Sequence, residues 1–467
     1  MGSQQRPRGA RLRGPARQIF LCLLCGLGLS LVYTADFLTE SCFLASFEWE
    51  PGLSNTALWA IASLSASLIA IVLSFRRETF ARRGLLLAVA LCAVVGFTAV
   101  EAGALDRGIL PASLTMLACL SFAGVMLTLM WLELVSRFES AWIRRAIVSS
   151  ILFEALQRFA IEALGVGTMA FACMLYVLAI AVFLAMRASD VRCLQGKRIE
   201  KRHIKVRSTA FVGIVIVTLS ANISLNAMSD PAAESPLFAE LSLAAVAVVM
   251  WLMLVRPSFP RYSALIKLVL TMFISAFIAF ASVEMFSPIA QMLAFSAGAL
   301  FWFAVVLLAT ETSSYAQIPR TRLLASVYAV LASQGFFAAM ISSVIPEDTA
   351  QAHVMYACVA VLLVLAALWL VGERDVSLFL LGEQVDPPHN LNMAGQVALA
   401  SERFGLTARE EEVLGLYAQG RSAPFIAEQF GISQNTVKSH LSNIYAKMGV
   451  HSRQELISSV SGLTRTV

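Results

Sequence analysis

The stretch GISQNTVKSHLSNIYAKMG, residues 431–449, predicts one helix with defined ends and two different faces. Ser433 is a favoured N-cap residue, and Gly449 is suited to the left-handed turn that ends a helix. The apolar residues recur at helical spacing and are expected to face a small core: Val437, Leu441, Ile444 and Met448. The other face carries short or cationic polar residues: Gln434, Asn435, Lys438, Ser439 and Ser442.

The flanking residues predict three further short helices, so the quoted helix is the third of four in residues 405–467. A hydroxyl residue stands at each expected helix start: Thr407, Ser422, Ser433 and Ser452. Glu410 and Glu455 follow two of these residues at the spacing of a capping box. A small all-α domain with its own core is therefore expected at this end of the chain.

The polar face of the third helix has the kinds of side chain that can contact nucleic acid. Short hydroxyls, amides and a lysine can donate to phosphates or base edges without bulk, and a helix–turn–helix presents the N-terminal half of its second helix to the major groove. The residues LTAREEEVLGLYAQGRSAPFIAEQFGISQNTVKSHLSNIYAKMGVHSRQEL, from Leu406 to Leu456, resemble the LuxR-type helix–turn–helix of bacterial transcription regulators. The resemblance implies a four-helix domain that binds double-stranded DNA as a homodimer, commonly paired through its last helix.

Carried over by position, the resemblance gives a set of expected DNA-binding residues: Ser433, Gln434, Asn435, Thr436, Lys438, Ser439, Ser442 and Lys447. The chain departs from the family after Ser422, where Ala423-Pro424-Phe425 stands in place of Asn-Lys-Glu. From residue 405 onward six Lys/Arg face five Asp/Glu, so the domain is nearly neutral. Since DNA affinity grows with the number of neutralised phosphates, a single copy is expected to bind weakly and a pair much better.

The rest of the chain is too apolar for a soluble protein. Hydrophobic residues make up 58% of the sequence and charged residues 14%, against about 25% charged in ordinary soluble domains. A membrane-spanning helix needs about 20 mainly apolar residues. Twelve stretches qualify: 19–38, 55–74, 84–101, 110–135, 146–164, 166–186, 208–228, 236–255, 262–286, 288–310, 323–345 and 352–372.

Loop charges predict the orientation. Loops on the N-terminal side, including the basic tail 1–18, carry 24 Lys/Arg, whereas the opposite loops carry Arg107. Cytoplasmic loops are the basic ones, so both termini are expected in the cytoplasm of a multi-pass protein of the cell membrane, in contact with membrane lipid.

The basic loop 187–207 divides the spans into halves, 19–186 and 208–372, each with six. This layout resembles the major facilitator superfamily over residues 19–372. The loop motif of that superfamily is faintly echoed, with Glu78 at its acidic position and Arg82 and Arg83 at its basic pair. Transport does not follow from the fold. Residues 373–404 are expected to be a linker with one short helix from Ala394 to Arg403.

Charged and polar residues inside the spans are candidates for a ligand site. Glu154, Arg158 and Glu162 lie four apart on one helix face and should point into the bundle, because charge is costly in a membrane. They could form a ligand or proton site, or a structural ion pair. Further polar residues could line a pocket or join helices by hydrogen bonds: Asn222, Asn226, Glu284, Gln291 and Gln334. Asp36, Glu133 and Glu240 lie near span ends and are expected at the membrane interface.

No arrangement typical of an enzyme is present in the sequence: no phosphate-binding loop, nucleophile elbow, metal-ligand spacing or cofactor motif. The leading hypothesis is a membrane-bound one-component transcription regulator that senses an unknown small molecule or membrane state through the 12-span part. The alternative is a secondary transporter with a DNA-binding regulatory tail. A third hypothesis is a tail used for protein pairing alone.

Overall fold

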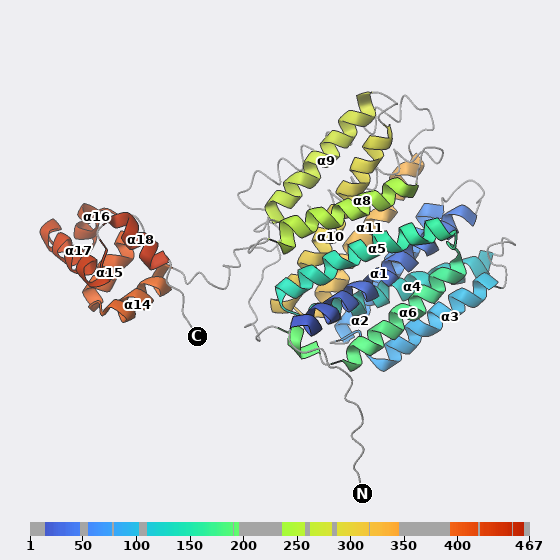
Figure 1. Cartoon of the computed structure of the whole chain (residues 1–467), viewed down its shortest axis with the longest axis horizontal. Coiled ribbons are helices and arrows are strands. Elements are labelled where there is room, and N and C mark those ends of the chain that lie inside the picture. Colours follow the sequence, from blue (N-terminus) through green and yellow to red (C-terminus); the bar gives the residue numbers. More distant parts are fainter. Residues whose placement is uncertain are drawn as a thin grey trace, which may run out of the picture. The chain divides into compact units, whose positions relative to one another are not determined.

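The computed structural model describes residues 15–46, 55–76, 79–101, 110–189, 191–195, 236–256, 262–282, 287–316, 318–344, 393–418, 421–450 and 452–461. Within these residues the chain is helical and has no strand, which confirms the predicted all-α fold. The chain divides into two compact units, Met1–Glu383 and Gln384–Val467 (Figure 1).

The described part of the first unit contains long helices: α1 (Pro15–Ser46), α2 (Asn55–Arg76), α3 (Arg83–Glu101), α4 (Leu110–Val135), α5 (Ser140–Leu164), α6 (Met169–Ala188), α8 (Pro236–Met250), α9 (Tyr262–Ser282), α10 (Ser287–Tyr315) and α11 (Arg320–Val344). Two short elements join them, the 3-10 turn η1 (Val191–Leu194) and the π-helical turn η2 (Trp251–Val255), which continues α8. Ten of the twelve predicted spans coincide with these helices, and the predicted spans 208–228 and 352–372 lie outside the described residues.

Length and composition fit a membrane bundle. Among the described helices, five stretches are long and apolar enough to cross a bilayer: Pro15–Phe43, Leu58–Arg76, Leu114–Val135, Met169–Ala188 and Ile289–Ser314. Large apolar side chains such as Leu87, Phe75 and Val72 are more than half exposed. In water this surface would be unfavourable, whereas lipid tails cover it at no cost.

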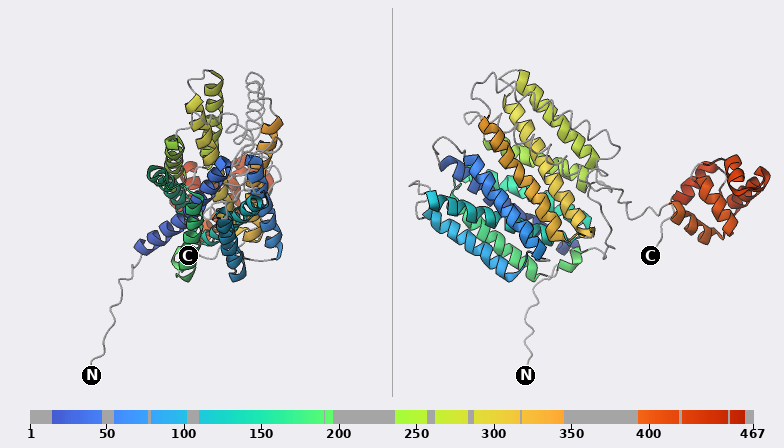
Figure 2. Two further views of the ribbon diagram at one scale, coloured as in Figure 1. Left: turned by 90° about the vertical axis from the view of Figure 1, so that its right-hand side faces the viewer. Right: turned by 180° about the vertical axis from the view of Figure 1, so that it is seen from behind.

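The bundle is built around α1, which packs against α4, α5 and α6. Figure 1 shows α3 beside α6, and Figure 2 shows α2 and α11 side by side, while α9 packs against α10. The closest contacts depend on glycine. A side chain at Gly28 on α1 would collide with the indole of the fully buried Trp131 on α4, so glycine lets these two helices approach.

The second unit is a cluster of short helices: α14 (Met393–Phe404), α15 (Ala408–Ala418), α16 (Ala423–Phe430), α17 (Gln434–Met448) and α18 (Arg453–Ser461). Its core is formed by buried apolar residues from every one of these helices, among them Val397, Leu414, Ile426, Ile444 and Leu456. The four predicted helices are α15 to α18. The short helix predicted at residues 394–403 corresponds to α14, which packs into this core through Val397 and Ala400 and so forms part of the folded unit.

Side-chain caps fix the ends of these helices, as predicted at three of four starts. Thr407 and Glu410 form a reciprocal capping box: the Thr407 N–H donates to Glu410 Oε2 at 2.8 Å, and the Glu410 N–H donates to Thr407 Oγ1 at 3.3 Å. The Thr436 N–H donates to Ser433 Oγ at 3.1 Å, and the Glu455 N–H donates to Ser452 Oγ at 3.1 Å. Ser422 occupies the N-cap of α16, but its side chain makes no cap hydrogen bond.

Candidate functional site

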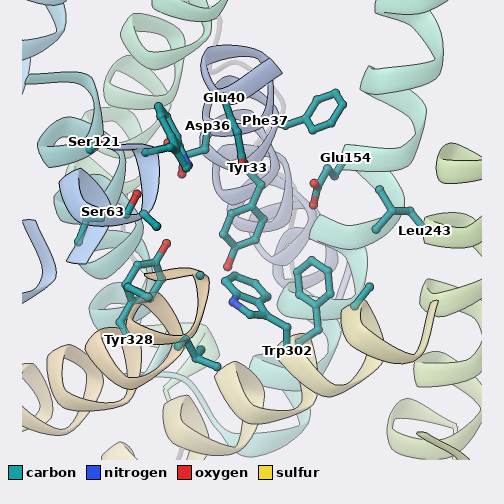
Figure 3. Close-up of a pocket in the computed structure, with 18 of the residues that line it drawn as sticks. Tyr33, Asp36, Phe37, Glu40, Ser63, Ser121, Glu154, Leu243, Trp302 and Tyr328 are labelled. Atoms are coloured by element: carbon teal, nitrogen blue, oxygen red, sulfur yellow. The ribbon is translucent and has the colours of Figure 1, made fainter. Parts of the chain in front are cut away.

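A cavity of about 450 Å³ lies inside the membrane bundle (Figure 3). Seven of the described helices contribute to its lining: α1, α2, α4, α5, α8, α10 and α11. Its charged side chains are Asp36 and Glu40 from α1 and Glu154 and Arg158 from α5. Most of its large side chains are aromatic: Tyr33, Phe37, Trp59, Phe295, Trp302, Phe303 and Tyr328. The volume falls within the usual range of small-molecule sites, which are apolar with a few convergent polar groups.

Two of the three charges predicted on α5 reach this cavity. Arg158 forms an ion pair with Glu154, one helical turn earlier, and its guanidinium lies over the ring of Phe37 at 3.6 Å from the centroid. Glu162 is exposed and joins no ion pair within the described residues, so it does not belong to this group. The interior position predicted for Glu162 is therefore wrong, because each step of four residues moves a side chain about 40° around the helix, which carries Glu162 off the face of Glu154.

The carboxylates of α1 are a part of the site that the sequence interpretation missed. Asp36 was expected at the membrane interface but lines the cavity, where it accepts a hydrogen bond from the Tyr176 hydroxyl. Tyr33, Asp36, Phe37 and Glu40 recur at the i, i+3, i+4, i+7 spacing of one helix face. That spacing is the signal in the sequence that could have identified them.

Aromatic side chains form the wall opposite the charges. The ring of Trp302 contacts Tyr33, Phe303 and Tyr328 edge-on, with centroids 5.4, 4.9 and 6.4 Å apart. In Figure 3, Glu154 points toward Tyr33, and Tyr33 points toward Trp302. Such edge-to-face contacts favour fixed orientations of the rings.

Glu133 and Glu240 were also expected at the interface, and both are buried. Glu133 on α4 is held by three donors: the Thr79 hydroxyl at 2.5 Å, the Phe80 N–H at 2.8 Å and the Arg137 guanidinium at 2.8 Å. It therefore anchors the short connection between α2 and α3, in which Glu78 was matched to the acidic position of the loop motif. Glu78 lies outside the described residues.

The other polar candidates of the membrane part do not join the described cavity. Gln291 is half-buried on α10 and does not line it. Gln334 falls within α11, but its side chain lies outside the described part of the chain. Asn222, Asn226 and Glu284 also lie outside the described residues.

In the second unit, α16 and α17 form a helix–turn–helix. Gly431 adopts a φ of 63° between them, a left-handed conformation that favours glycine. Val437, Leu441, Ile444 and Met448 are buried on α17, as their spacing predicts. The opposite face is exposed, and it carries the residues predicted to face DNA: Ser433, Gln434, Asn435, Thr436, Lys438, Ser439 and Ser442.

Lys447 differs from the other predicted DNA-binding residues. Its ammonium donates to Glu410 Oε2 at 2.7 Å and to the Gly405 carbonyl at 3.0 Å. The Lys447 hydrogen bond is the main reason that the pKa of Glu410 falls to about 2, with the Thr407 N–H adding to the effect. Lys447 is thus an internal tie between the end of α17 and the start of α15, which a local sequence pattern could not reveal.

Arg453 and two tyrosines form a second tie that the sequence interpretation missed. The Arg453 guanidinium donates to the Arg421 carbonyl at 3.0 Å and lies over the Tyr417 ring at 4.5 Å. The hydroxyls of Tyr417 and Tyr445 are 3.1 Å apart. Burial, followed by this contact with Tyr417, raises the pKa of Tyr445 to about 12. These contacts join α15, α17 and the start of α18, so the exposed face of α17 sits on a rigid support.

Comparison with known proteins bears directly on this unit. Residues 405–460 match the family described as bacterial regulatory proteins, luxR family. Residues 405–460 are a LuxR-type helix–turn–helix domain. Over 53 residues the chain is 51% identical to the monoamine regulon transcriptional regulator of Klebsiella aerogenes, a match that covers 11% of this chain and 23% of that regulator. The chain thus spans about a quarter of the length of this curated relative.

The LuxR-type domain is joined to a membrane part whose fold is that of transporters. A bacterial homologue of the iron transporter ferroportin, solved in an outward-facing state, superimposes with a TM-score of 0.53 at 13% identity, over 78% of this chain and all of that one. The human organic anion transporter MFSD10 gives 0.50 at 12% identity, over 76% of this chain and all of that one. Identities this low show the fold alone, and they confirm the major-facilitator-like fold predicted for the membrane part. The protein is a multi-pass membrane protein with a LuxR-type domain that implies DNA binding.

Proposed function

We propose that this chain is a membrane-bound, one-component transcription regulator, which senses a small molecule in its membrane cavity and binds promoter DNA through its LuxR-type domain. One observation carries the proposal: a single chain combines a transporter-like bundle around a cavity with a helix–turn–helix whose DNA-facing surface is exposed. No separate input domain stands between the two in the sequence.

The proposed DNA contacts follow from the exposed face of α17. Lys438 is exposed and joins no ion pair within the described residues, so its charge is free to meet a phosphate or a guanine. Ser439 and Ser442 would lie against base edges. Lys447 and Arg409 are each paired with a glutamate, so the surface has little free positive charge. A homodimer, paired as is typical of the family, would supply the affinity that one copy lacks.

The direct test uses the full-length protein in lipid nanodiscs and a pool of random double-stranded oligonucleotides. We expect salt-sensitive retention of DNA and enrichment of a common sequence, both weakened in Lys438→Ala. Arg409→Ala is the matched control, because it removes one positive charge from the same domain outside α17. No DNA binding at any salt concentration would refute the proposal, and equal DNA binding by Lys438→Ala and the wild type would refute the role given to Lys438.

The proposed orientation places both termini in the cytoplasm of the cell membrane. It is supported by the 24 Lys/Arg in loops on the N-terminal side against Arg107 on the other. A green fluorescent protein fused after Val467 should fluoresce, and alkaline phosphatase at the same position should be inactive. Active phosphatase at that position would contradict the orientation. The LuxR-type domain would then lie outside the cytoplasm and could not reach chromosomal DNA.

The transporter-like fold and cavity favour a second candidate function, a secondary transporter whose tail reports occupancy to DNA. Both functions need a change between two arrangements of the bundle that a ligand biases. Uptake into vesicles separates them: a regulator changes promoter output on binding its ligand without moving it, whereas a transporter accumulates the solute inside the vesicle.

A further inference from the structure

We propose that the membrane cavity binds an organic cation, such as an alkyl or aryl ammonium ion. This inference rests on the proposed function in one respect, that the bound cation would be the signal. The binding chemistry itself stands on the residues that line the cavity: their charge, their aromatic rings and their unpaired polar atoms.

The charge of the lining is unbalanced. Asp36, Glu40 and Glu154 contribute three carboxyl groups, and among the described lining residues Arg158 is the one cation. Arg158 is already paired with Glu154 and stacked on the Phe37 ring. Acidic groups away from water are unfavourable as anions unless a positive charge meets them. The carboxyl groups of α1 therefore offer a site for a cation that the protein itself does not fill.

The aromatic rings suit the same ligand. Trp302 lies edge-on against both Tyr33 and Tyr328, and Trp59 and Phe295 line the cavity as well. The face of an aromatic ring attracts a cation, and cages of several rings are the usual receptors for substituted ammonium ions. An anion would meet the negative faces of these rings and the carboxyl groups together, so the lining disfavours it.

Unpaired polar atoms point to a ligand of this chemistry. Glu154 is 3% exposed, and its Oε2 has no hydrogen-bond partner within the described residues, while Oε1 pairs with Arg158. The hydroxyls of Tyr33 and Ser121, both buried lining residues, likewise have no partner there. Buried polar groups are nearly always satisfied, and these three oxygens could meet the positive charge of an ammonium ion, its N–H groups where it carries them, or the polar groups of its substituents.

The geometry favours an organic cation over a metal ion. Within the described residues no group of three His, Cys, Asp or Glu side chains converges closely enough to hold a metal. A metal ion needs several oxygen ligands at about 2.0–2.6 Å. The cavity of about 450 Å³ is instead lined largely by aromatic side chains, which fits a diffuse cation attached to an apolar body.

The test compares two soluble probes of similar size and opposite permanent charge, benzyltrimethylammonium and benzenesulfonate. Full-length protein in nanodiscs is titrated with each while its tryptophan fluorescence is recorded, because Trp59 and Trp302 line the cavity. We expect saturable quenching by the cation and none by the anion. Glu40→Gln and Glu154→Gln should each weaken cation binding about tenfold or more.

Glu162→Gln is the matched control, since it removes a carboxylate from the same helix as Glu154 but outside the cavity, and it should bind the cation within about twofold of the wild type. Glu154→Gln also breaks the pair with Arg158 and could impair folding. Glu40→Gln breaks no described hydrogen bond, so it keeps the test valid. Equal affinity for both probes, or unchanged binding in Glu40→Gln, would overturn the inference.

The same preparation separates this inference from the proposed function. Cation binding that is saturable, with no retention of DNA, would sustain the ligand class and refute the regulator. Retention of DNA that depends on Lys438, with no preference for the cation over the anion, would support the regulator and refute the ligand class. If both hold, adding benzyltrimethylammonium tests whether occupancy of the cavity changes DNA affinity.

Discussion

Arg144 on α5 donates a hydrogen bond of 2.7 Å to Glu311 on α10, and this ion pair joins the two predicted halves of the membrane bundle. The other oxygen of Glu311 accepts a hydrogen bond of 2.5 Å from the hydroxyl of Tyr262 on α9. The side chains of Arg144 and Glu311 are 13% and 8% exposed. A buried pair of this kind has two states, made or broken, which is what a switch between two arrangements of the bundle requires.

Breaking this pair should destabilise the present arrangement. Glu311→Gln leaves Arg144 buried without a counter-charge, and the loss of one partner of a buried pair costs about 3–5 kcal/mol. We expect a lower midpoint of thermal unfolding in detergent and a shifted basal output from a promoter reporter. Arg145→Gln is the control, since Arg145 is the exposed neighbour of Arg144. If Glu311→Gln unfolds at the wild-type temperature with unchanged output, the pair has no such role.

The Glu410–Lys447 pair should make the LuxR-type domain sensitive to acid. The pKa of Glu410 falls from 4.5 to about 2 in the folded domain, mainly through the hydrogen bond from Lys447. A carboxyl with a lowered folded pKa stabilises the fold above its unfolded pKa and loses that contribution as protons bind. The free energy of unfolding of residues 384–467 should therefore drop between about pH 4.5 and pH 2.

Glu410→Gln tests this sign directly by chemical denaturation followed with circular dichroism. The variant should be less stable than the wild type at pH 7, and the difference should shrink as the pH falls toward 2. Glu412→Gln is the matched control, because that glutamate pairs with Arg409 at the surface, where ion pairs contribute little. A stability difference that stays constant from pH 7 to pH 2 would contradict the assigned role of Lys447.

Salt dependence should distinguish the roles of the two lysines of α17. Lys438→Ala removes one phosphate contact, so the slope of log K against log salt should become shallower by about 0.9 per bound copy. Lys447→Ala should leave that slope unchanged and lower the stability of the domain, because Lys447 is held by Glu410. Both slopes can be measured by fluorescence anisotropy on the sequence enriched from the oligonucleotide pool. A shallower slope in Lys447→Ala would assign that lysine to DNA after all.

Local periodicity was sufficient to predict the helix–turn–helix. The caps at Thr407 and Ser433 and the apolar spacing from Val437 to Met448 depend on neighbours within a few residues, and the structure has them as predicted. The role of Lys447 could not be read in this way. Its partner Glu410 lies 37 residues earlier, and the contact exists only once α15 and α17 have packed together.

The cavity was harder to predict because helix ends are not set by apolar length alone. The predicted first span of twenty residues ended at residue 38, which placed Asp36 at the interface. In the structure α1 continues to Ser46, so Asp36 lies well inside the helix. The same error placed Glu311 beyond the predicted span 288–310, although α10 runs to Tyr315. Buried acidic residues can be stabilised by cationic partners on other helices, as Arg144 stabilises Glu311. Such pairs leave no local pattern in the sequence.

The position of Asp36 depends on a glycine, and this dependence gives a sharp test of the cavity. A Cβ atom at Gly124 on α4 would collide with the Asp36 carboxylate and lie 3.1 Å from the Tyr176 hydroxyl. Gly124→Ala should therefore push Asp36 out of its contact with Tyr176 and weaken binding of benzyltrimethylammonium about tenfold, since it displaces one of the cavity's carboxyl groups. Gly84→Ala is the control, because no atom lies within 4 Å of a Cβ placed there. Combining Gly124→Ala with Asp36→Asn should add little further loss, since both act on one group. Additive losses in the double variant would mean that Gly124 acts on the cavity by another route.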